Sequence, residues 1–323
     1  MDVISGWRAA PGGLPAPTPA AADPTELSAL ADADLELLLT IRHFELSLLD
    51  LFGRGQLNGT THTCLGQEYV PVALRPLIGE GDHIFSNHRG HGHYLARFAD
   101  PAGLLAEIMG RQGAVCHGVG GSQHILRDGY LSTGVQGESL PVAVGVALHL
   151  KRAGQGRLAA VYIGDGTWGE GAVYEALNVA ALWNLPVLVL VEHNGIAQST
   201  ATEHQMAGTI ADRAAAFGIR HRLVTSTDVN VIRAELAPRV TEVRLTGRPL
   251  VVEFVTRRVG PHSKGDDTRS PEELRAIEGQ DWYRRYARHH PAQFQRLDLA
   301  VREQLADVVR EVTARPLSTW TEA

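Results

Sequence analysis

The sequence predicts an α/β fold built around a mostly parallel sheet. Two stretches, Leu158–Ile163 and Val187–Glu192, are continuously apolar, which is typical of strands that are buried on both faces. A helical pattern over Gly169–Trp183 joins them, and a further helix and strand follow at about Val229–Leu245 and Leu250–Thr256. Because strands that alternate with helices pair in parallel and are covered on both faces, we expect a three-layer α/β architecture.

Further helices are predicted before and after this central region. Apolar residues recur at helical spacing from Leu35 to Leu51, and helices are also expected at about Gln67–Leu77, Ser139–Lys151 and 271–312. The stretch 79–137 is rich in Gly and His and is expected to consist mainly of loops. Long structured loops inside a compact domain are usually functional, so this stretch is a candidate for site residues.

The domain organisation is predicted from composition. Residues 1–24 are rich in Ala, Pro and Gly, and we expect them to form a disordered arm. Residues 25–323 are expected to form a single domain with terminal helices, a size that allows a substantial core.

The totals exclude several classes of function. The 323 residues carry a formal net charge of −6, which argues against nucleic acid as a partner. No apolar run is long enough to span a membrane, and no signal-peptide pattern is present. The two cysteines, Cys64 and Cys116, are too few for a disulfide framework, so a reducing cytoplasm is the expected compartment.

Polar residues that could bind a metal follow the two apolar strands. Asp165 comes directly after the first strand between two glycines, and Asn194 follows the second strand. Since the carboxyl ends of adjacent parallel strands share one sheet edge, both side chains should emerge together there. Carboxylate and amide oxygens suit Mg²⁺, and Gly166 would let the backbone approach a phosphate. The alternative is that the GDG segment is only a tight turn and that Asn194 only caps a loop.

These motifs resemble a known family. The segment GDGTWGEGAVYEALNVAALWNLPVLVLVEHNGIAQST is similar to the α subunit of the thiamine diphosphate-dependent E1 component of 2-oxo acid dehydrogenases, of the acetoin and branched-chain types. The resemblance extends from about Leu38 to Arg269. It implies the thiamine diphosphate-binding fold, with Mg²⁺ held by Asp165, Asn194 and the backbone carbonyl of Ile196. The family usually has Tyr at position 196 and Asn at position 193, where this chain has His193.

A histidine-rich segment, SNHRGHGH, occupies residues 86–93. Alone, it fits either a transition-metal site or a hydrogen-bonded structural turn. The resemblance adds a third interpretation, in which His88 and Arg89 match an aromatic–arginine pair that binds the diphosphate. Arg suits such contacts because its guanidinium forms paired hydrogen bonds with phosphate.

Other segments match the same family. The GxGGSxH loop at 118–124 is implied to lie beside the active site, and the backbone of Gly134 and Gln136 to bind the aminopyrimidine ring. Gly166 and Thr167 are expected to face the diphosphate. His262, in the segment RVGPHSKGDDTR, matches the active-site histidine, for which we expect a catalytic and cofactor-binding role. Ser263 beside it matches a serine that is phosphorylated in mitochondrial relatives, although nothing in this sequence indicates modification.

One component of the chemistry is missing from the chain. Thiamine enzymes use a Glu from a second, similar domain to activate the cofactor, and this chain has room for one such domain. The resemblance implies a separate β subunit, an α2β2 assembly and a lipoyl-bearing E2 partner. The expected reaction is decarboxylation of a 2-oxo acid, or cleavage of acetoin, with transfer of the fragment to a lipoyl group. A carbon–carbon ligase subunit, a non-catalytic subunit and half of a split transketolase-like enzyme are the alternatives.

Overall fold

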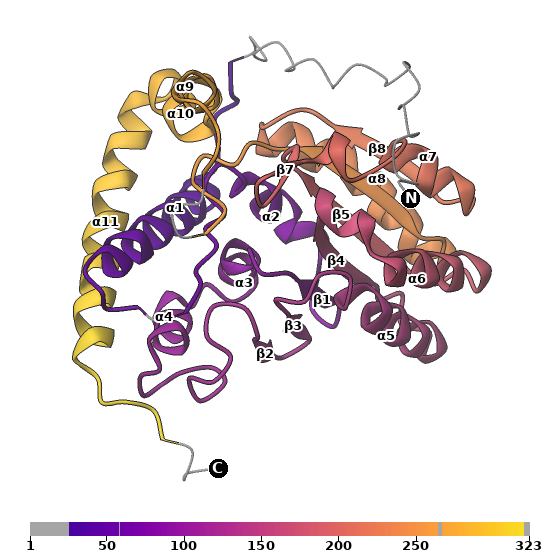
Figure 1. The fold of residues 1–323 in the computed structure, drawn as a ribbon, viewed down its shortest axis with the longest axis horizontal. Coiled ribbons are helices and arrows are strands. Elements are labelled where there is room, and N and C mark those ends of the chain that lie inside the picture. The colour runs from indigo at the N-terminus through magenta and orange to yellow at the C-terminus, as the bar shows by residue number, and fades with distance from the viewer. Residues whose placement is uncertain (1–25, 58, 264–266, 320–323) are drawn as a thin grey trace, which may run out of the picture.

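A seven-stranded sheet forms the centre of the computed structural model, which describes residues 26–57, 59–263 and 267–319 (Figure 1). The strand order is β2-β3-β1-β4-β5-β9-β8. Every neighbouring pair is parallel except β2 and β3, which are antiparallel. The strands are β1 His83–Ser86, β2 Leu126–Arg127, β3 Tyr130–Ser132, β4 Ala159–Gly164, β5 Val187–His193, β8 Arg220–Val224 and β9 Leu250–Val255.

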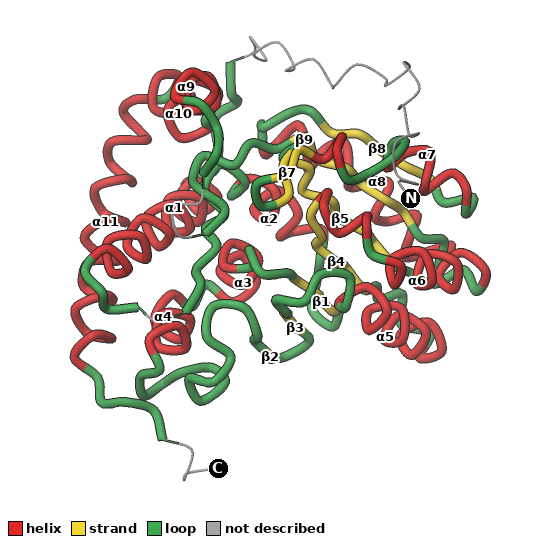
Figure 2. Tube along the Cα trace, viewed as in Figure 1, coloured by secondary structure: helices red, strands yellow, loops and turns green. Residues whose placement is uncertain are grey.

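Helices cover both faces of the sheet, as Figure 2 shows. One face packs against α5 Ser139–Ala153, α6 Gly171–Leu182 and α7 Ile210–Ala216. The other packs against helices from both ends of the chain: α1 Asp32–Gly53, α2 Tyr69–Leu74, α3 His91–Phe98, α4 Pro101–Met109, α8 Val229–Thr246, α10 Trp282–His289 and α11 Pro291–Ala314. Helix α9, Pro271–Gln280, precedes α10. The predicted three-layer α/β fold is confirmed.

The apolar strands explain why two layers of helices are needed. Along β5, Val187, Val189 and Val191 belong to the core beside α5 and α6, while Leu188 and Leu190 belong to the opposite core. All five side chains are fully buried. Strand β5 therefore contributes to two hydrophobic cores, which is the property that the continuous apolar runs predict.

Two regions differ from the sequence-based expectation. The stretch 79–137, expected to be mainly loops, contains β1, α3, α4, β2 and β3, and α7 and β8 lie between 210 and 224 where no element was expected. Helix α3 has the sequence HGHYLARF, in which buried histidines replace the apolar residues that normally reveal a helix. The N-terminal arm expected at 1–24 lies outside the described residues. No helix in the described part of the chain has both the length and the apolar character needed to cross a membrane.

A buried ion network joins the N-terminal and C-terminal helices. On α1, the guanidinium of Arg42 donates to Glu68 at 2.5 Å and to both carboxylate oxygens of Asp281 at 2.7 and 2.8 Å. The second oxygen of Glu68 accepts from the indole of Trp282 at 2.7 Å and from the backbone N–H of Gly66 at 2.8 Å. The carboxylate of Glu68 therefore links α1 to α10.

Glu68→Gln is expected to lower the free energy of unfolding by about 3 kcal/mol, since breaking a buried ion pair leaves Arg42 incompletely neutralised. A matched control lies at the C-terminal end of α1, the helix that carries Arg42. Arg54 and Asp50 form an exposed ion pair at 2.7 Å, with side chains 65% and 55% accessible. Asp50→Asn should cost less than about 1 kcal/mol. Urea unfolding measures both variants, and equal losses would contradict a structural role for the buried network.

Candidate active site at the carboxyl ends of the strands

Asp165 lies at the carboxyl end of β4, at the start of the 3-10 helix η2 Asp165–Gly169. Strand β5 is its direct neighbour, with Gly164 paired to Glu192, so Asn194 follows at the same sheet edge as expected. The Asp165 side chain is buried. Its Oδ2 atom accepts a hydrogen bond from the hydroxyl of Thr202 and lies 3.7 Å from His193 Nε2. These contacts engage one carboxylate oxygen and orient the other.

Asn194 begins a tight turn that also presents Ile196. The Asn194 Oδ1 atom accepts from the backbone N–H of Ile196 at 3.2 Å, and its Nδ2 donates to Gln67 Oε1 at 3.4 Å. Ile196 opens the short strand β6 Ile196–Ala197, which pairs with β7 Thr200–Ala201. The turn at Asp165 therefore supplies a carboxylate, and the neighbouring turn supplies the amide oxygen of Asn194 and the backbone carbonyl of Ile196. This set of hard oxygen donors fits Mg²⁺, with phosphate oxygens or water to complete an octahedron.

The two glycines around Asp165 have different constraints. A Cβ on Gly166 would lie 2.6 Å from the Cβ of Ala197, whereas a Cβ on Gly164 would have nothing within 4 Å. Gly166 therefore permits a close approach between the GDG turn and β6, the segment that carries Ile196.

Gly166→Ala is expected to destabilise the protein by about 1–3 kcal/mol, because the added methyl group overpacks the contact with Ala197. Gly164→Ala is the matched control and should change the free energy of unfolding by much less. Urea unfolding without cofactor measures both. Equal effects would show that the two glycines serve only as a flexible turn.

A second polar network, absent from the sequence-based expectation, extends from Asp165 toward the edge of the sheet. Glu253 on β9 accepts from His193 Nδ1 at 2.6 Å and interacts with His221 Nε2 at 2.7 Å. Although burial acts in the opposite direction, hydrogen bonds from the two histidines lower the pKa of Glu253 to about 2. Burial also opposes the raised pKa of His193, which results from its hydrogen bond with Glu253 and the charge of Asp165. His193 thus connects two carboxylates.

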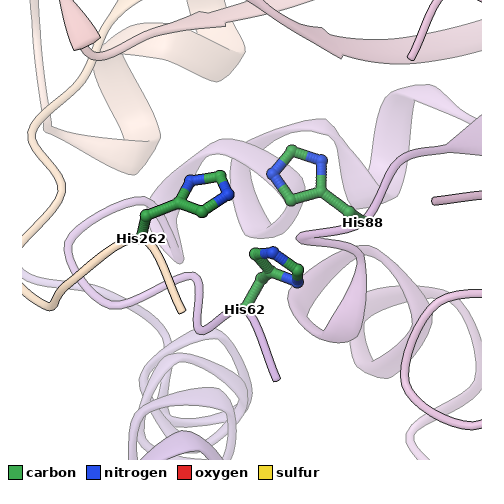
Figure 3. Close-up of side chains that lie close together, drawn as sticks. All are labelled: His62, His88 and His262. Atoms are coloured by element: carbon green, nitrogen blue, oxygen red, sulfur yellow. The ribbon is translucent and has the colours of Figure 1, made fainter. Parts of the chain in front are cut away.

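Three histidines from distant parts of the sequence converge in a separate cluster (Figure 3). His62 lies between α1 and α2, His88 follows β1, and His262 follows β9. The ring centroids of His62 lie 4.6 Å from His88 and 4.7 Å from His262. His62 was not singled out from the sequence, since no motif marks it and long-range folding brings it to the site.

Two arginines surround His262. Arg89 NH2 lies 3.4 Å from both Nδ1 and the backbone oxygen of His262, and Arg258 NH1 lies 3.4 Å from the same Nδ1. Arg89 also donates to the backbone oxygen of Thr63. The structure therefore brings together the sequence-predicted residues His88, Arg89 and His262. The guanidinium groups of Arg89 and Arg258 make the surroundings of His262 favourable for an anion.

The transition-metal interpretation of the 86–93 segment does not fit the geometry of the described residues. His91 contacts Glu45 at 3.1 Å, and His93 contacts Ser86 at 2.7 Å and Glu192 at 3.3 Å, so these side chains diverge from His88. The nitrogens of His62, His88 and His262 do lie within 4.8 Å of one another. However, the adjacent guanidinium groups would repel a cation from this cluster.

The segment expected to contact the aminopyrimidine ring also reaches this cluster. Gln136 Nε2 lies 2.7 Å from His88 Nδ1 and 3.2 Å from the carbonyl oxygen of Gly134. The hydroxyl of Thr167 donates to Gln136 Oε1 at 2.8 Å. Gln136, expected to act through its backbone, therefore links the histidine cluster to the GDG turn through its side chain.

The GxGGSxH loop is organised by one buried carboxylate. Glu107 on α4 accepts backbone hydrogen bonds from Cys116, Gly118 and Gly120 at 2.6, 3.0 and 2.8 Å. An open cavity of about 540 Å³ adjoins this loop and the start of α5. Several exposed apolar side chains lie in the same part of the chain: Val119, Leu126, Val135 and Val142.

This arrangement of strand-end oxygens beside a cluster of arginine and histidine side chains is typical of cofactor-binding α/β enzymes, and comparison with known proteins identifies the family. The dehydrogenase E1 component family matches residues 36–316. The α subunit of acetoin:2,6-dichlorophenolindophenol oxidoreductase from Cupriavidus necator is 38% identical over 250 residues, which cover 74% of this chain and 75% of that protein. The pyruvate dehydrogenase E1 component α subunit from Zymomonas mobilis is 37% identical over 237 residues, with 72% and 67% covered.

The chain therefore belongs to the dehydrogenase E1 component family, and the resemblance to its α subunits is confirmed. Membership implies thiamine diphosphate as the cofactor, and the α-subunit type implies a β-subunit partner.

Proposed function

We propose that this chain is the α subunit of a thiamine diphosphate-dependent enzyme that acts on a 2-oxo acid or on acetoin. Its site would bind the cofactor's diphosphate through Mg²⁺. The observation that carries this proposal is the placement of Asp165 and Asn194 at the ends of adjacent parallel strands, beside the close-packed Gly166 turn. Parallel sheets bind phosphate-bearing ligands at this position.

Each residue has a proposed role toward the cofactor. Asp165, Asn194 and the carbonyl of Ile196 bind the metal, while Gly166 and Thr167 border the diphosphate. Arg89 neutralises phosphate charge, with His88 and His262 beside it. The backbone of Gly134 and Gln136 contacts the aminopyrimidine ring. When bound, thiamine diphosphate supplies an electron sink for cleaving a carbon–carbon bond next to a carbonyl group.

His262 has the proposed catalytic role. It lies between the guanidinium groups of Arg89 and Arg258, and its ring faces the other two histidines of the cluster. In this position it can stabilise negative charge on a reacting group or transfer a proton during acyl transfer.

We further propose an α2β2 assembly in which the β subunit supplies the glutamate that activates the cofactor. The exposed apolar residues beside the GxGGSxH loop are consistent with a partner surface next to the site. A lipoyl-bearing E2 subunit is the proposed acceptor of the product fragment. The free thiols of Cys64 and Cys116 are consistent with a reducing cytoplasm.

One experiment tests this proposal. The chain is produced together with its β subunit, and calorimetry measures binding of thiamine diphosphate with and without Mg²⁺. Pyruvate, branched-chain 2-oxo acids and acetoin are then assayed with a lipoyl domain as the acceptor. Metal-dependent binding with lipoyl-dependent turnover is expected. Binding without lipoyl-dependent turnover, but with carbon–carbon ligation to an added aldehyde, would favour a ligase. Absence of cofactor binding would contradict the proposal.

A further inference from the structure

The orientation of the Gln136 side-chain amide is fixed by its neighbours. Its Nε2 lies 3.2 Å from the carbonyl oxygen of Gly134, a group that can only accept a hydrogen bond. The Thr167 hydroxyl donates to Oε1 at the other end of the amide, at 2.8 Å. The nitrogen therefore faces both Gly134 and His88, because the reverse orientation would place two acceptors against each other.

This orientation assigns the tautomer of His88. Gln136 Nε2 donates to His88 Nδ1 at 2.7 Å, so Nδ1 is an acceptor without a proton. A neutral imidazole carries its proton on the other nitrogen, which makes His88 Nε2 a donor. In Figure 3, the His88 ring points toward His262 and away from its own backbone, so this donor is directed into the cluster.

His262 receives the same assignment from different neighbours. Its Nδ1 lies 3.4 Å from one nitrogen of Arg89 and 3.4 Å from one nitrogen of Arg258. Since guanidinium groups only donate, Nδ1 of His262 accepts, and a neutral His262 carries its proton on Nε2.

We propose that Gln136 is a positioning residue: the chain Thr167–Gln136–His88 places the His88 proton on Nε2, so that this nitrogen donates and the cluster binds an anionic oxygen. This proposal rests on the proposed function insofar as that oxygen belongs to the cofactor's diphosphate. Thr167 lies two positions after Asp165, so the same relay connects the metal-binding turn to the donor.

The charges around His88 maintain its neutral state. Burial, the cation of Arg89, the neighbouring His62 and His262 and the cation of Arg258 all lower the pKa of His88 well below its ordinary value. These effects favour the neutral form of His88, in which the tautomer determines whether Nε2 donates or accepts.

Nitrogen-15 NMR of histidine-labelled full-length protein measures the tautomer directly. The His88 signals are identified by their loss in His88→Phe. In the wild type at neutral pH, we expect an unprotonated Nδ1 and a protonated Nε2. A protonated Nδ1 in neutral His88 would overturn the proposal.

Gln136→Glu tests the relay itself. The new carboxylate can only accept, so it should draw a proton to His88 Nδ1 and change the NMR signature. Gln136→Leu, which removes the donor, should give a mixture of tautomers. Gln112→Glu, an exposed position with the same charge change, is the control and should leave the His88 signals unchanged. Wild-type His88 signals in both Gln136 variants would overturn the proposal.

Cofactor affinity separates this inference from the proposed function. In the complex with the β subunit, Gln136→Leu should weaken thiamine diphosphate binding by about tenfold, the effect of losing one hydrogen bond to a charged group. Unchanged affinity would overturn the link between the relay and anion binding. If the His88 tautomer responds to the Gln136 variants as expected but the wild-type protein binds no thiamine diphosphate, the role of Gln136 is supported and the proposed function is contradicted.

Discussion

Asp165→Asn is expected to weaken the metal-dependent binding of thiamine diphosphate severely. The substitution preserves the shape of the side chain and can keep an oxygen to accept from Thr202. It removes the negative charge that a divalent cation requires. Substitutions of groups that contact a metal ligand, without binding the metal themselves, typically reduce metal affinity 10–100-fold. Removing the charge of a ligand itself should therefore reduce the affinity for Mg²⁺ by at least ~100-fold. Calorimetry with thiamine diphosphate and Mg²⁺ measures this loss.

The control for this experiment is Asp128→Asn. Asp128 has a side chain that is 85% accessible and a backbone φ of 36°, a conformation that Asn tolerates well. The two variants have the same change in charge, so differences between them reflect position. If Asp165→Asn binds cofactor as tightly as Asp128→Asn does, Asp165 is a turn residue and the central element of the proposed site is wrong.

The second large expected effect is the loss of turnover without the β subunit. The chain alone is expected to turn over substrate about 10²–10⁴-fold more slowly than the complex, the contribution of general acid–base catalysis, because we propose that the β subunit supplies the activating glutamate. Steady-state assays with pyruvate or acetoin and an artificial electron acceptor measure the difference. Full activity of the isolated chain would contradict this prediction.

Glu138 is a candidate substitute for the glutamate that we propose comes from the β subunit, because it lies next to the Gly134–Gly137 segment. Its carboxylate is exposed and accepts a hydrogen bond from Thr133 at 2.8 Å. We expect Glu138→Gln to leave turnover of the complex within about twofold, since we propose that the activating glutamate comes from the β subunit and general acid–base catalysis by Glu138 would contribute far more than this. A loss comparable to removal of the β subunit would instead assign the activating role to Glu138.

The central part of the fold could be predicted because its signals are local. Strands β4, β5 and β9 are continuous apolar runs, and their separation by helices determines the parallel sheet. The stretch 79–137 could not be predicted in the same way. Strand β1 has four residues, and α3 is stabilised by buried polar contacts such as His91 with Glu45. Trp183, which caps the C-terminus of α6, is 50% exposed, whereas Trp168 is fully buried.

The residues of the candidate site that belong to a sequence motif could be predicted. The residues that reach the site only through contacts between distant segments could not. Asp165 and Asn194 follow strands that are adjacent in both sequence and space. His62 and Glu253 carry no local signal, because their positions beside His262 and His193 depend on contacts between distant segments. The side-chain role of Gln136 depends in the same way on a carbonyl, a hydroxyl and an imidazole from three segments.

The different burial of the two cysteines has a practical consequence. Cys64 is fully buried, and burial raises the pKa of its thiol well above the ordinary value. Cys116 is only partly buried and borders the open cavity near the exposed apolar residues. A thiol-reactive fluorophore should therefore label Cys116 in preference to Cys64 in the folded protein. Such a label would report binding of the β subunit in real time, independently of cofactor and catalysis.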